Sequence, residues 1–308
     1  TTPVEIDPFT IPLEQKLDLL FRADEIIRLN PRVKVSEGNV ISVKRHKYFA
    51  NTEGAFLEQI IFESGCGISA TAVTETEVQV RSHPNSFRYQ GTGGWEYVTH
   101  ADLAGNAERV AEEAVALLTA DVCPSKETTL ILGSSQLALQ IHESCGHPTE
   151  LDRVFGTEAA FAGRSFLSTD KRNHFRYGSE IVNLTADSVR ATGLGTFGWD
   201  DEGVPASNMP LVRNGEFVGY LMSRETASTL GLQSNGCMRA DGWNRIPLIR
   251  MTNVSLEPGT WNLDDMIADT DDGILMDTNR SWSIDDMRLN FQFGTEVGYE
   301  IKNGKRGR

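Results

Sequence analysis

The apolar positions near the start of the chain predict an amphipathic helix. They recur at helical spacing between residues 12 and 30, and Pro31 closes the segment. The positions are Leu13, Leu17, Leu20, Ala23, Ile26 and Ile27. Because such a helix has one apolar face to bury, we expect it to pack against a sheet.

From residue 33 to about residue 88 the pattern changes to short runs rich in β-forming residues. The runs cover residues 33–35, 40–43, 56–64 and 71–80, and Glu-Gly, Thr-Glu-Gly and Cys-Gly segments separate them. This succession of short runs and turn residues predicts an antiparallel meander.

A second helix is predicted over residues 102–118, with Asp102 as its cap. Its stripe of small apolar residues suits close packing on a sheet. The stripe consists of Ala104, Ala107, Val110, Ala111, Ala114 and Leu117. A strand at 128–132 and a Gly-Ser-Ser turn then lead into an apolar-rich helix from Leu137.

Beyond Phe166 the pattern returns to strands and loops. Asn214-Gly215 is a hairpin signal, and a short helix is expected near residues 223–230. Further strands are expected around 249–255 and 289–301.

These elements predict an α+β fold with two domains. Antiparallel sheets with flanking helices form the expected N-terminal domain over residues 1–195. A mostly β domain is expected over residues 196–308, with the change near residues 190–200, where a glycine-rich stretch occurs.

Composition and charge narrow the class of protein. With 39% hydrophobic and 23% charged residues, the 308-residue chain is typical of a globular protein. Its formal charge of −14 argues against binding to nucleic acid or anionic lipid through a broad positive surface. The chain lacks a secretory signal and a long apolar run, and its four cysteines are scattered. We therefore expect a soluble cytoplasmic protein with no direct nucleic-acid partner and no membrane contact.

The segment from Ile141 to Asp152 carries the candidate chemistry, and it reads Ile-His-Glu-Ser-Cys-Gly-His-Pro-Thr-Glu-Leu-Asp. A zinc hydrolase needs neutral imidazoles to hold the ion and a carboxylate beside the metal-bound water. His142 and His147 are the candidate metal ligands for Zn²⁺, and Glu143 is the candidate catalytic base that activates the water.

The spacing of the two histidines constrains the local structure. They are five residues apart, whereas the familiar helical zinc motif has them four apart. At about 100° per residue, an unbroken α-helix would separate them by about 140°. The helix must therefore end or distort between them, and Gly146 and Pro148 supply a termination signal. Spacing alone also allows both histidines to be ordinary polar residues at a helix end.

The wider sequence resembles the TldD/PmbA family of metallopeptidases, on its TldD side. Phe161-Ala-Gly-Arg-Ser-Phe166 follows the His-Glu motif, and further similar segments occur in the family's order. These segments are Asn51–Gly54, Gly93–Tyr97, Trp199–Pro205, Ser234–Gly236 and Arg250–Asn253. The resemblance implies a zinc peptidase that cuts unfolded or short peptides, as a homodimer or with a PmbA-like partner that lacks the metal motif.

Residue by residue, the resemblance assigns His142 and His147 to the family's zinc ligands and Glu143 to its base. The family's third ligand is a cysteine nearer the C-terminus, expected beyond Arg308, so the chain is expected to be a fragment. None of the four cysteines has the matching context, and we expect Cys145 and Cys237 to be structural.

Several other polar residues leave alternatives open. Glu150 and Asp152 are expected to orient a ligating histidine, although turn residues are the simpler alternative. The acidic run 200–202 favours a solvated tight turn over a cation site. Three arginines receive no role, because substrate binding and surface ion pairing both fit them. They are Arg239, Arg245 and Arg250.

Two rival functions follow from the same residues. The main alternative is a non-catalytic, metal-free partner or scaffold subunit of a TldD/PmbA-type complex, because only two protein ligands are identifiable. A modulator of DNA topology that acts on nucleic acid is disfavoured by the acidic charge.

Overall fold

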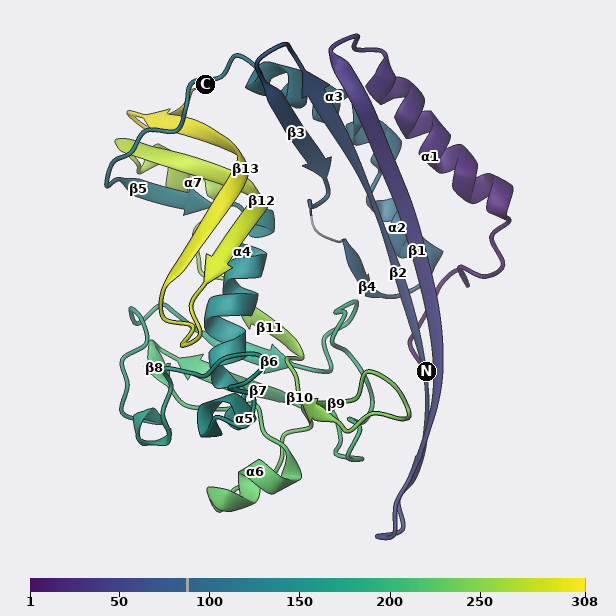
Figure 1. Ribbon diagram of the computed structural model, residues 1–308, viewed down its shortest axis with the longest axis vertical. Helices are drawn as coiled ribbons and strands as arrows, with labels where there is room; N and C mark the ends of the chain where they lie inside the picture. The colour runs from purple at the N-terminus through teal and green to yellow at the C-terminus, as the bar shows by residue number, and fades with distance from the viewer. Residues whose placement is uncertain (87–88, 308) are drawn as a thin grey trace.

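A four-stranded antiparallel sheet forms the N-terminal half of the computed structural model, which describes residues 1–86 and 89–307. Its strands are β1 (Val33–Ala50), β2 (Phe56–Val73), β3 (Val78–His83) and β4 (Gln90–Thr92). β2 pairs with β1 along its length and with β3 and β4 on its other edge. The predicted meander is confirmed, but its short runs merge into two long strands that project as a hairpin (Figure 1).

Three helices cover this sheet: α1 (Leu13–Arg28), α2 (Trp95–His100) and α3 (Leu103–Leu117). The helices predicted over residues 12–30 and 102–118 are confirmed as α1 and α3. The Asp102 carboxylate accepts from the backbone N–H of Gly105, as expected of a helix cap. Small residues of α3, including Ala107 and Ala114, are fully buried in the cluster between helices and sheet.

Two further sheets and a short strand pair form the C-terminal half. One sheet has the order β14-β13-β12-β5, and β5 is parallel to β12. The other has the order β11-β6-β7-β8. The strands are β5 (Thr129–Leu132), β6 (Leu184–Asp187), β7 (Asn208–Arg213), β8 (Glu216–Phe217), β9 (Met238–Arg239), β10 (Leu248–Ile249), β11 (Asn253–Leu256), β12 (Asp272–Ile284), β13 (Phe291–Lys302) and β14 (Lys305–Arg306).

Local signals account for several elements of this half. Asn214 and Gly215 have φ values of 48° and 77°, the backbone that a tight two-residue hairpin requires, and they join β7 to β8. The helix expected near residues 223–230 is α6 (Arg224–Thr229), capped by Ser223. The pattern did not reveal α7 (Leu263–Ala268) or β12. The mixture of helices and mainly antiparallel sheets confirms the α+β class.

Buried apolar residues form one cluster from Ala23 to Leu118 and another from Leu151 to Met251. The second cluster contains residues on both sides of residue 195. The division into domains at that residue stays a prediction. Among the described residues, no helix combines the length and apolar character that crossing a bilayer requires.

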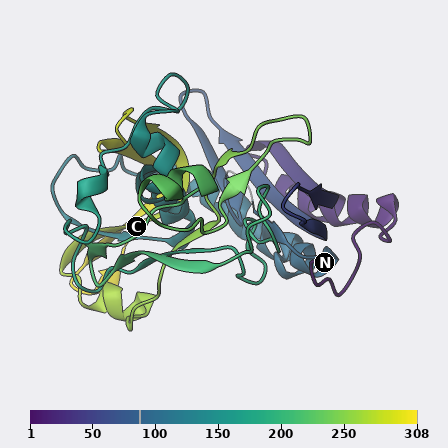
Figure 2. The same ribbon diagram turned by 90° about the horizontal axis from the view of Figure 1, so that it is seen from below.

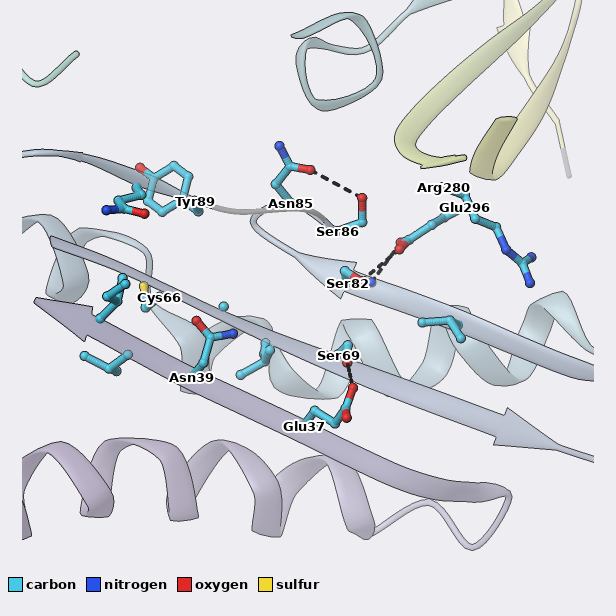
Figure 3. A pocket seen from close by; sticks show the side chains of 16 residues that line it. Glu37, Asn39, Cys66, Ser69, Ser82, Asn85, Ser86, Tyr89, Arg280 and Glu296 are labelled. Atoms are coloured by element: carbon cyan, nitrogen blue, oxygen red, sulfur yellow. Dashed lines mark hydrogen bonds between the residues drawn. The ribbon is translucent and has the colours of Figure 1, made fainter. Parts of the chain in front are cut away.

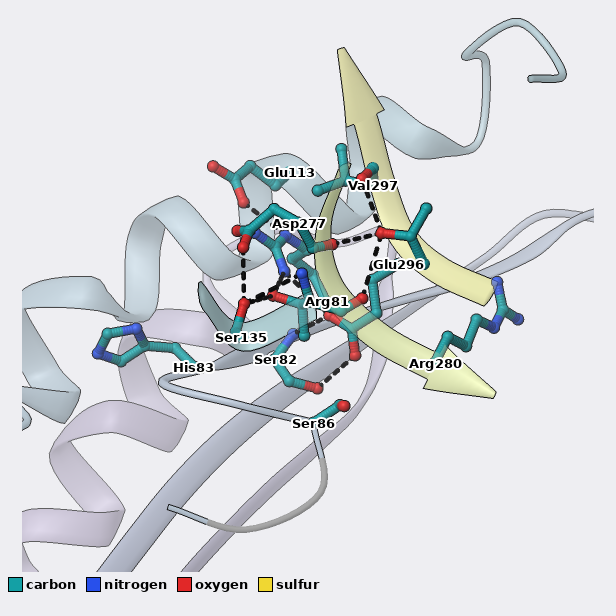
Figure 4. Close-up of polar contacts among 12 residues, drawn as sticks. Arg81, Ser82, His83, Ser86, Glu113, Ser135, Asp277, Arg280, Glu296 and Val297 are labelled. Carbon is teal, nitrogen blue, oxygen red and sulfur yellow. Dashed lines mark hydrogen bonds and ion pairs between the residues drawn. The ribbon is translucent and has the colours of Figure 1, made fainter. Parts of the chain in front are cut away.

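A buried arginine on β3 connects the two halves (Figure 4). Arg81 donates to Glu113 of α3 at 2.7 Å, to Asp277 at 2.9 Å and to Glu296 at 3.0 Å. Asp277 also accepts from the Ser135 hydroxyl at 2.6 Å. Because Ser135 lies in the first turn of the helix that leads into the His-Glu segment, this network links the N-terminal sheet to that helix.

Candidate metal centre

The helix that carries the motif changes its hydrogen-bonding pattern along its length. α4 (Ser134–Gln140) passes into a π-helical turn (Ile141–Gly146), then a 3-10 turn (His147–Thr149), and then α5 (Leu151–Phe155). The backbone N–H of His147 donates to the carbonyl of His142, five residues earlier. A π-helical turn contains one more residue than an α-helical turn, so His147 returns to the face of His142. The predicted distortion is confirmed.

Gly146 serves a different purpose from the one its sequence context indicates. Its φ is −78°, so the turn does not need a left-handed residue there. A Cβ atom at this position would lie 1.9 Å from Sδ of Met251. Close packing against Met251 therefore requires the glycine, and the chain continues beyond it in a 3-10 turn.

The three candidate site residues lie together. One ligand atom from each of His142, Glu143 and His147 falls within 4.8 Å of the others. The two imidazole centroids are 4.8 Å apart at an interplanar angle of 85°. Nε2 of His147 lies 3.9 Å from Oε2 of Glu143. Two imidazoles and a carboxylate are a donor set of the kind that catalytic zinc sites use, so the residues present fit such an ion.

The electrostatic surroundings favour a neutral His142. Desolvation by the surrounding protein, and then the positive charge of the nearby His147, lower the pKa of His142 to about 4. The side chain of His142 nevertheless remains accessible to solvent. The neutral imidazole is the form that binds a metal ion.

Glu150 orients His147. Its Oε2 accepts from Nδ1 of His147 at 2.8 Å and from the Arg153 guanidinium at 2.8 and 3.1 Å. Burial alone would raise the pKa of Glu150, but the contacts with His147 and Arg153 outweigh it and lower that pKa. With Nδ1 engaged, Nε2 of His147 is the nitrogen left for a ligand, as in carboxylate–histidine–metal arrangements.

Asp152 has a different role from Glu150. Its oxygens accept from the backbone N–H groups of Arg153 at 2.7 Å and Ile249 at 3.3 Å. Burial and the nearby Glu150 raise the pKa of Asp152 to about 6. It therefore ties α5 to β10, and its hydrogen bonds do not reach the histidines.

Arg288 is a contact that the sequence did not reveal. Its Nη1 donates to Oε2 of Glu143 at 2.9 Å, and its Nη2 donates to the carbonyl of Ala162 at 3.1 Å. Arg288 lies between β12 and β13, 145 residues from Glu143 in the sequence. No local motif marks it, because only the packing of the β12–β13 hairpin brings it to the site.

The cysteines stand apart from this group. Within residues 1–86 and 89–307, no cysteine belongs to a cluster that could hold a metal ion. Cys145 packs against the C-terminal core, and Cys237 is buried in that core. All four cysteines are free thiols.

The acidic run after Trp199 is a turn, as the sequence favoured, but Asp200 is not solvated. Asp200 is buried and accepts from the backbone N–H groups of Glu202, Val204 and Met238. Gly203 closes the turn at a φ of 79°. These backbone donors offset the desolvation cost of burying the Asp200 carboxylate, so Asp200 needs no cation.

A separate open pocket of about 700 Å³ lies on the N-terminal sheet (Figure 3). Asn39, Ser69 and Ser82 line it, with Arg280 of β12 reaching in from the C-terminal half. The three candidate site residues do not line this pocket.

Comparison with known protein families identifies two matches that together cover most of the chain. Residues 6–120 match the model of the PmbA/TldA metallopeptidase central domain. Residues 125–308 match the model of the PmbA/TldA metallopeptidase C-terminal domain.

Among curated relatives, a metalloprotease of Methanocaldococcus jannaschii is 29% identical over 307 residues, covering 98% of this chain and 63% of the relative. A metalloprotease TldD homologue of Buchnera aphidicola subsp. Schizaphis graminum is 27% identical over 312 residues, covering 96% and 60%. The chain thus spans roughly three fifths of the length of these relatives.

Two solved structures share the fold. TldE from Thermococcus kodakarensis has a TM-score of 0.72 and 22% identity, over 94% of this chain and 63% of that one. A Thermotoga maritima protein, described as a proposed modulator of DNA gyrase, has a TM-score of 0.80 and 20% identity. That match covers 100% of this chain and 66% of the other.

Proposed function

Because the chain belongs to the PmbA/TldA metallopeptidase family, we propose that it carries a zinc-dependent peptidase site built on His142, Glu143 and His147. The observation that carries this proposal is the π-helical turn, which gathers two imidazoles and a carboxylate within 4.8 Å. The names of the relatives, which are metalloproteases, support the same class of reaction. Zinc is proposed from the donor set of nitrogen and oxygen atoms.

In this proposal His142 and His147 hold the ion, and each residue around them has a distinct task. Zinc, when bound, supplies a Lewis acid that polarises a peptide carbonyl and acidifies water. Glu143 accepts a proton from the attacking water and passes it to the leaving amine. Arg288 fixes the orientation of the Glu143 carboxylate through a charge-assisted hydrogen bond. Glu150 fixes the ring of His147.

The wider assignment extends this proposal. We propose unfolded or short peptides as substrates, and a cytoplasmic location in line with the four free thiols. A catalytic zinc site usually has three protein ligands, and in this proposal His142 and His147 are two of them. We propose a homodimer, or a pair with a second family member of the kind that the TldE neighbour represents.

The test is the variant Glu143→Gln, studied for both zinc content and peptide hydrolysis. The amide keeps the size of the side chain but accepts a proton far less readily, so zinc should remain bound while cleavage is lost. Hydrolysis retained by this variant would contradict the assignment of the base. A zinc-supplied protein that contains no zinc would favour the metal-free scaffold subunit instead.

A further inference from the structure

An open cleft of about 820 Å³ separates the β1–β2 hairpin from the segment around β9 and β10. Figure 2 shows that segment reaching toward the hairpin. Five cationic side chains from separate parts of the chain line the cleft. They are Arg45, Lys47, Arg239, Arg245 and Arg250. Four carboxylates line the cleft as well, namely Glu63, Asp200, Asp201 and Asp241, so the question is which cations they leave without a partner.

Three of these cations pair with carboxylates of the chain. Arg45 pairs with Glu63, Lys47 pairs with Asp201, and Arg250 lies 3.4 Å from Glu158.

Arg239 and Arg245 differ from those three. In the part of the chain that the structure describes, neither guanidinium donates a hydrogen bond or forms an ion pair. Asp200, which also lines the cleft, is occupied by backbone N–H groups. Asp241, the remaining carboxylate of the lining, forms no ion pair with either arginine. Two guanidinium groups with five N–H donors each are therefore available to a ligand.

Arg239 is the more informative of the two. Surrounding protein, and then the positive charges of Arg250 and Arg45, lower the pKa of Arg239, and the carboxylates of Glu150 and Asp201 offset part of that effect. Its side chain nevertheless remains exposed within the cleft. Arg45 and Arg250 already have carboxylate partners, so Arg239 is the one of these three guanidinium groups at which a bound anion would supply a missing counter-charge.

The strands that carry Arg239 pack against the helical segment of the candidate metal centre. Arg239 of β9 pairs with Leu248 of β10, and the backbone N–H of the next residue, Ile249, donates to Asp152 at 3.3 Å. Met251, the neighbour of Arg250, packs on Gly146 of the π-helical turn. The segment that carries Arg239 is therefore held against the helical turns that carry the two histidines.

We propose that Arg239, with Arg45 and Arg250 beside it, binds a carboxylate of the peptide substrate. The inference rests on the proposed peptidase function, and it names the substrate class as peptides that carry a carboxylate near the cleaved bond. The carboxylate is either the C-terminal group or an aspartate or glutamate side chain. A guanidinium binds such a group through two parallel hydrogen bonds, which fixes its position as well as its charge.

The experiment is calorimetric binding of short unlabelled peptides to the Glu143→Gln variant, which leaves the peptides intact. One peptide has uncharged side chains and a free C-terminus, the second is its C-terminal amide, and the third is the amide with one internal glutamate. We expect at least one carboxylate-bearing peptide to bind about tenfold or more tightly than the neutral amide, given the strength of charged hydrogen bonds. Which of the two binds more tightly identifies the source of the carboxylate.

Substitution of the arginine tests the site itself. In the Glu143→Gln background, Arg239→Gln should abolish the preference for the charged peptide, and Arg239→Lys should keep part of it. Arg213→Gln removes an exposed arginine of β7 that lies outside the cleft, so it should leave the preference unchanged. High salt should weaken the charged peptides more than the neutral one.

Equal binding of all three peptides, or a preference that survives in both Arg239 variants, would overturn the inference. If Arg239→Gln fails to fold, the test rests on Arg239→Lys and on the salt series. An unchanged preference in Arg239→Lys, or one that does not depend on salt, then overturns the inference. Because the assay measures binding, its outcome is separate from that of the peptidase test. A protein that binds carboxylates through Arg239 but never cleaves a peptide contradicts the proposed function alone.

Discussion

The backbone N–H of His147 donates to the carbonyl oxygen of His142, five residues earlier in the chain. In an α-helix the same N–H would reach the carbonyl of Glu143, and the histidines would lie on different faces. This π-helical hydrogen bonding is what lets a five-residue spacing form one donor group. The neighbouring contacts of the turn should therefore control metal binding.

Gly146→Ala should destabilise the protein, because the added Cβ would lie 1.9 Å from Sδ of the buried Met251. We expect a loss of about 1–3 kcal/mol in the free energy of unfolding, typical of overpacking, and weaker zinc binding. Urea unfolding measures the first effect. Gly259→Ala is the matched control, since a Cβ at Gly259 meets no atom within 4 Å. Equal stabilities for the two variants would show that the Met251 contact is unimportant.

Glu150→Gln should weaken zinc binding without preventing it. The amide cannot provide the charged partner that holds Nδ1 of His147, and loss of such a contact lowers metal affinity about 10–100-fold. Competition with a chromophoric zinc chelator measures the change. Glu216→Gln, at an exposed position of β8, serves as the control. Unchanged affinity in Glu150→Gln would remove Glu150 from the site.

Arg288→Gln should reduce turnover and leave the zinc content unchanged, because Arg288 contacts Glu143 and not the histidines. The charged hydrogen bond that is lost corresponds to about a tenfold decrease in kcat. Steady-state hydrolysis and elemental analysis of the same preparation separate the two effects. A variant that loses zinc as well would show that Arg288 supports the ligands and not only the base.

Arg81 and Arg109 both donate to Glu113, at 2.7 and 3.1 Å, but their side chains are 3% and 42% exposed. Arg81→Met would remove the buried guanidinium that three carboxylates share, among them the buried Glu296, and should cost about 3–5 kcal/mol of unfolding free energy. Arg109→Met breaks an exposed pair and should cost less than about 1 kcal/mol. Thermal or urea unfolding compares them. Similar losses would indicate that the buried network does not hold the two halves together.

Local sequence signals correctly predicted the caps and turns that depend only on neighbouring residues in the chain. Asp102 as a cap and Asn214-Gly215 as a hairpin turn needed no knowledge of the tertiary structure. Glycines were misleading where tertiary packing, and not a turn, requires them. The Cys66-Gly67 segment was taken as a break, yet Gly65 and Gly67 lie inside β2. At Gly65 a Cβ would lie 2.5 Å from the carbonyl oxygen of Tyr89, so packing selects glycine there.

The candidate site divides in the same way. Motif spacing together with the family resemblance pointed to His142, Glu143 and His147, and sequence proximity indicated Glu150. Arg288 could not be predicted, because the packing of a distant hairpin places it against Glu143. The sequence drew attention to Arg239, but only the lining of the cleft shows that it stands beside Arg45.

The zinc stoichiometry of wild type, Glu143→Gln, His142→Ala and His147→Ala, measured on zinc-supplied protein, tests the central claim most directly. The account predicts that wild type and Glu143→Gln retain zinc, while each histidine variant loses it, because the π-helical turn makes both imidazoles ligands of one ion. Zinc retained by both histidine variants, or absent from the wild type, would contradict it.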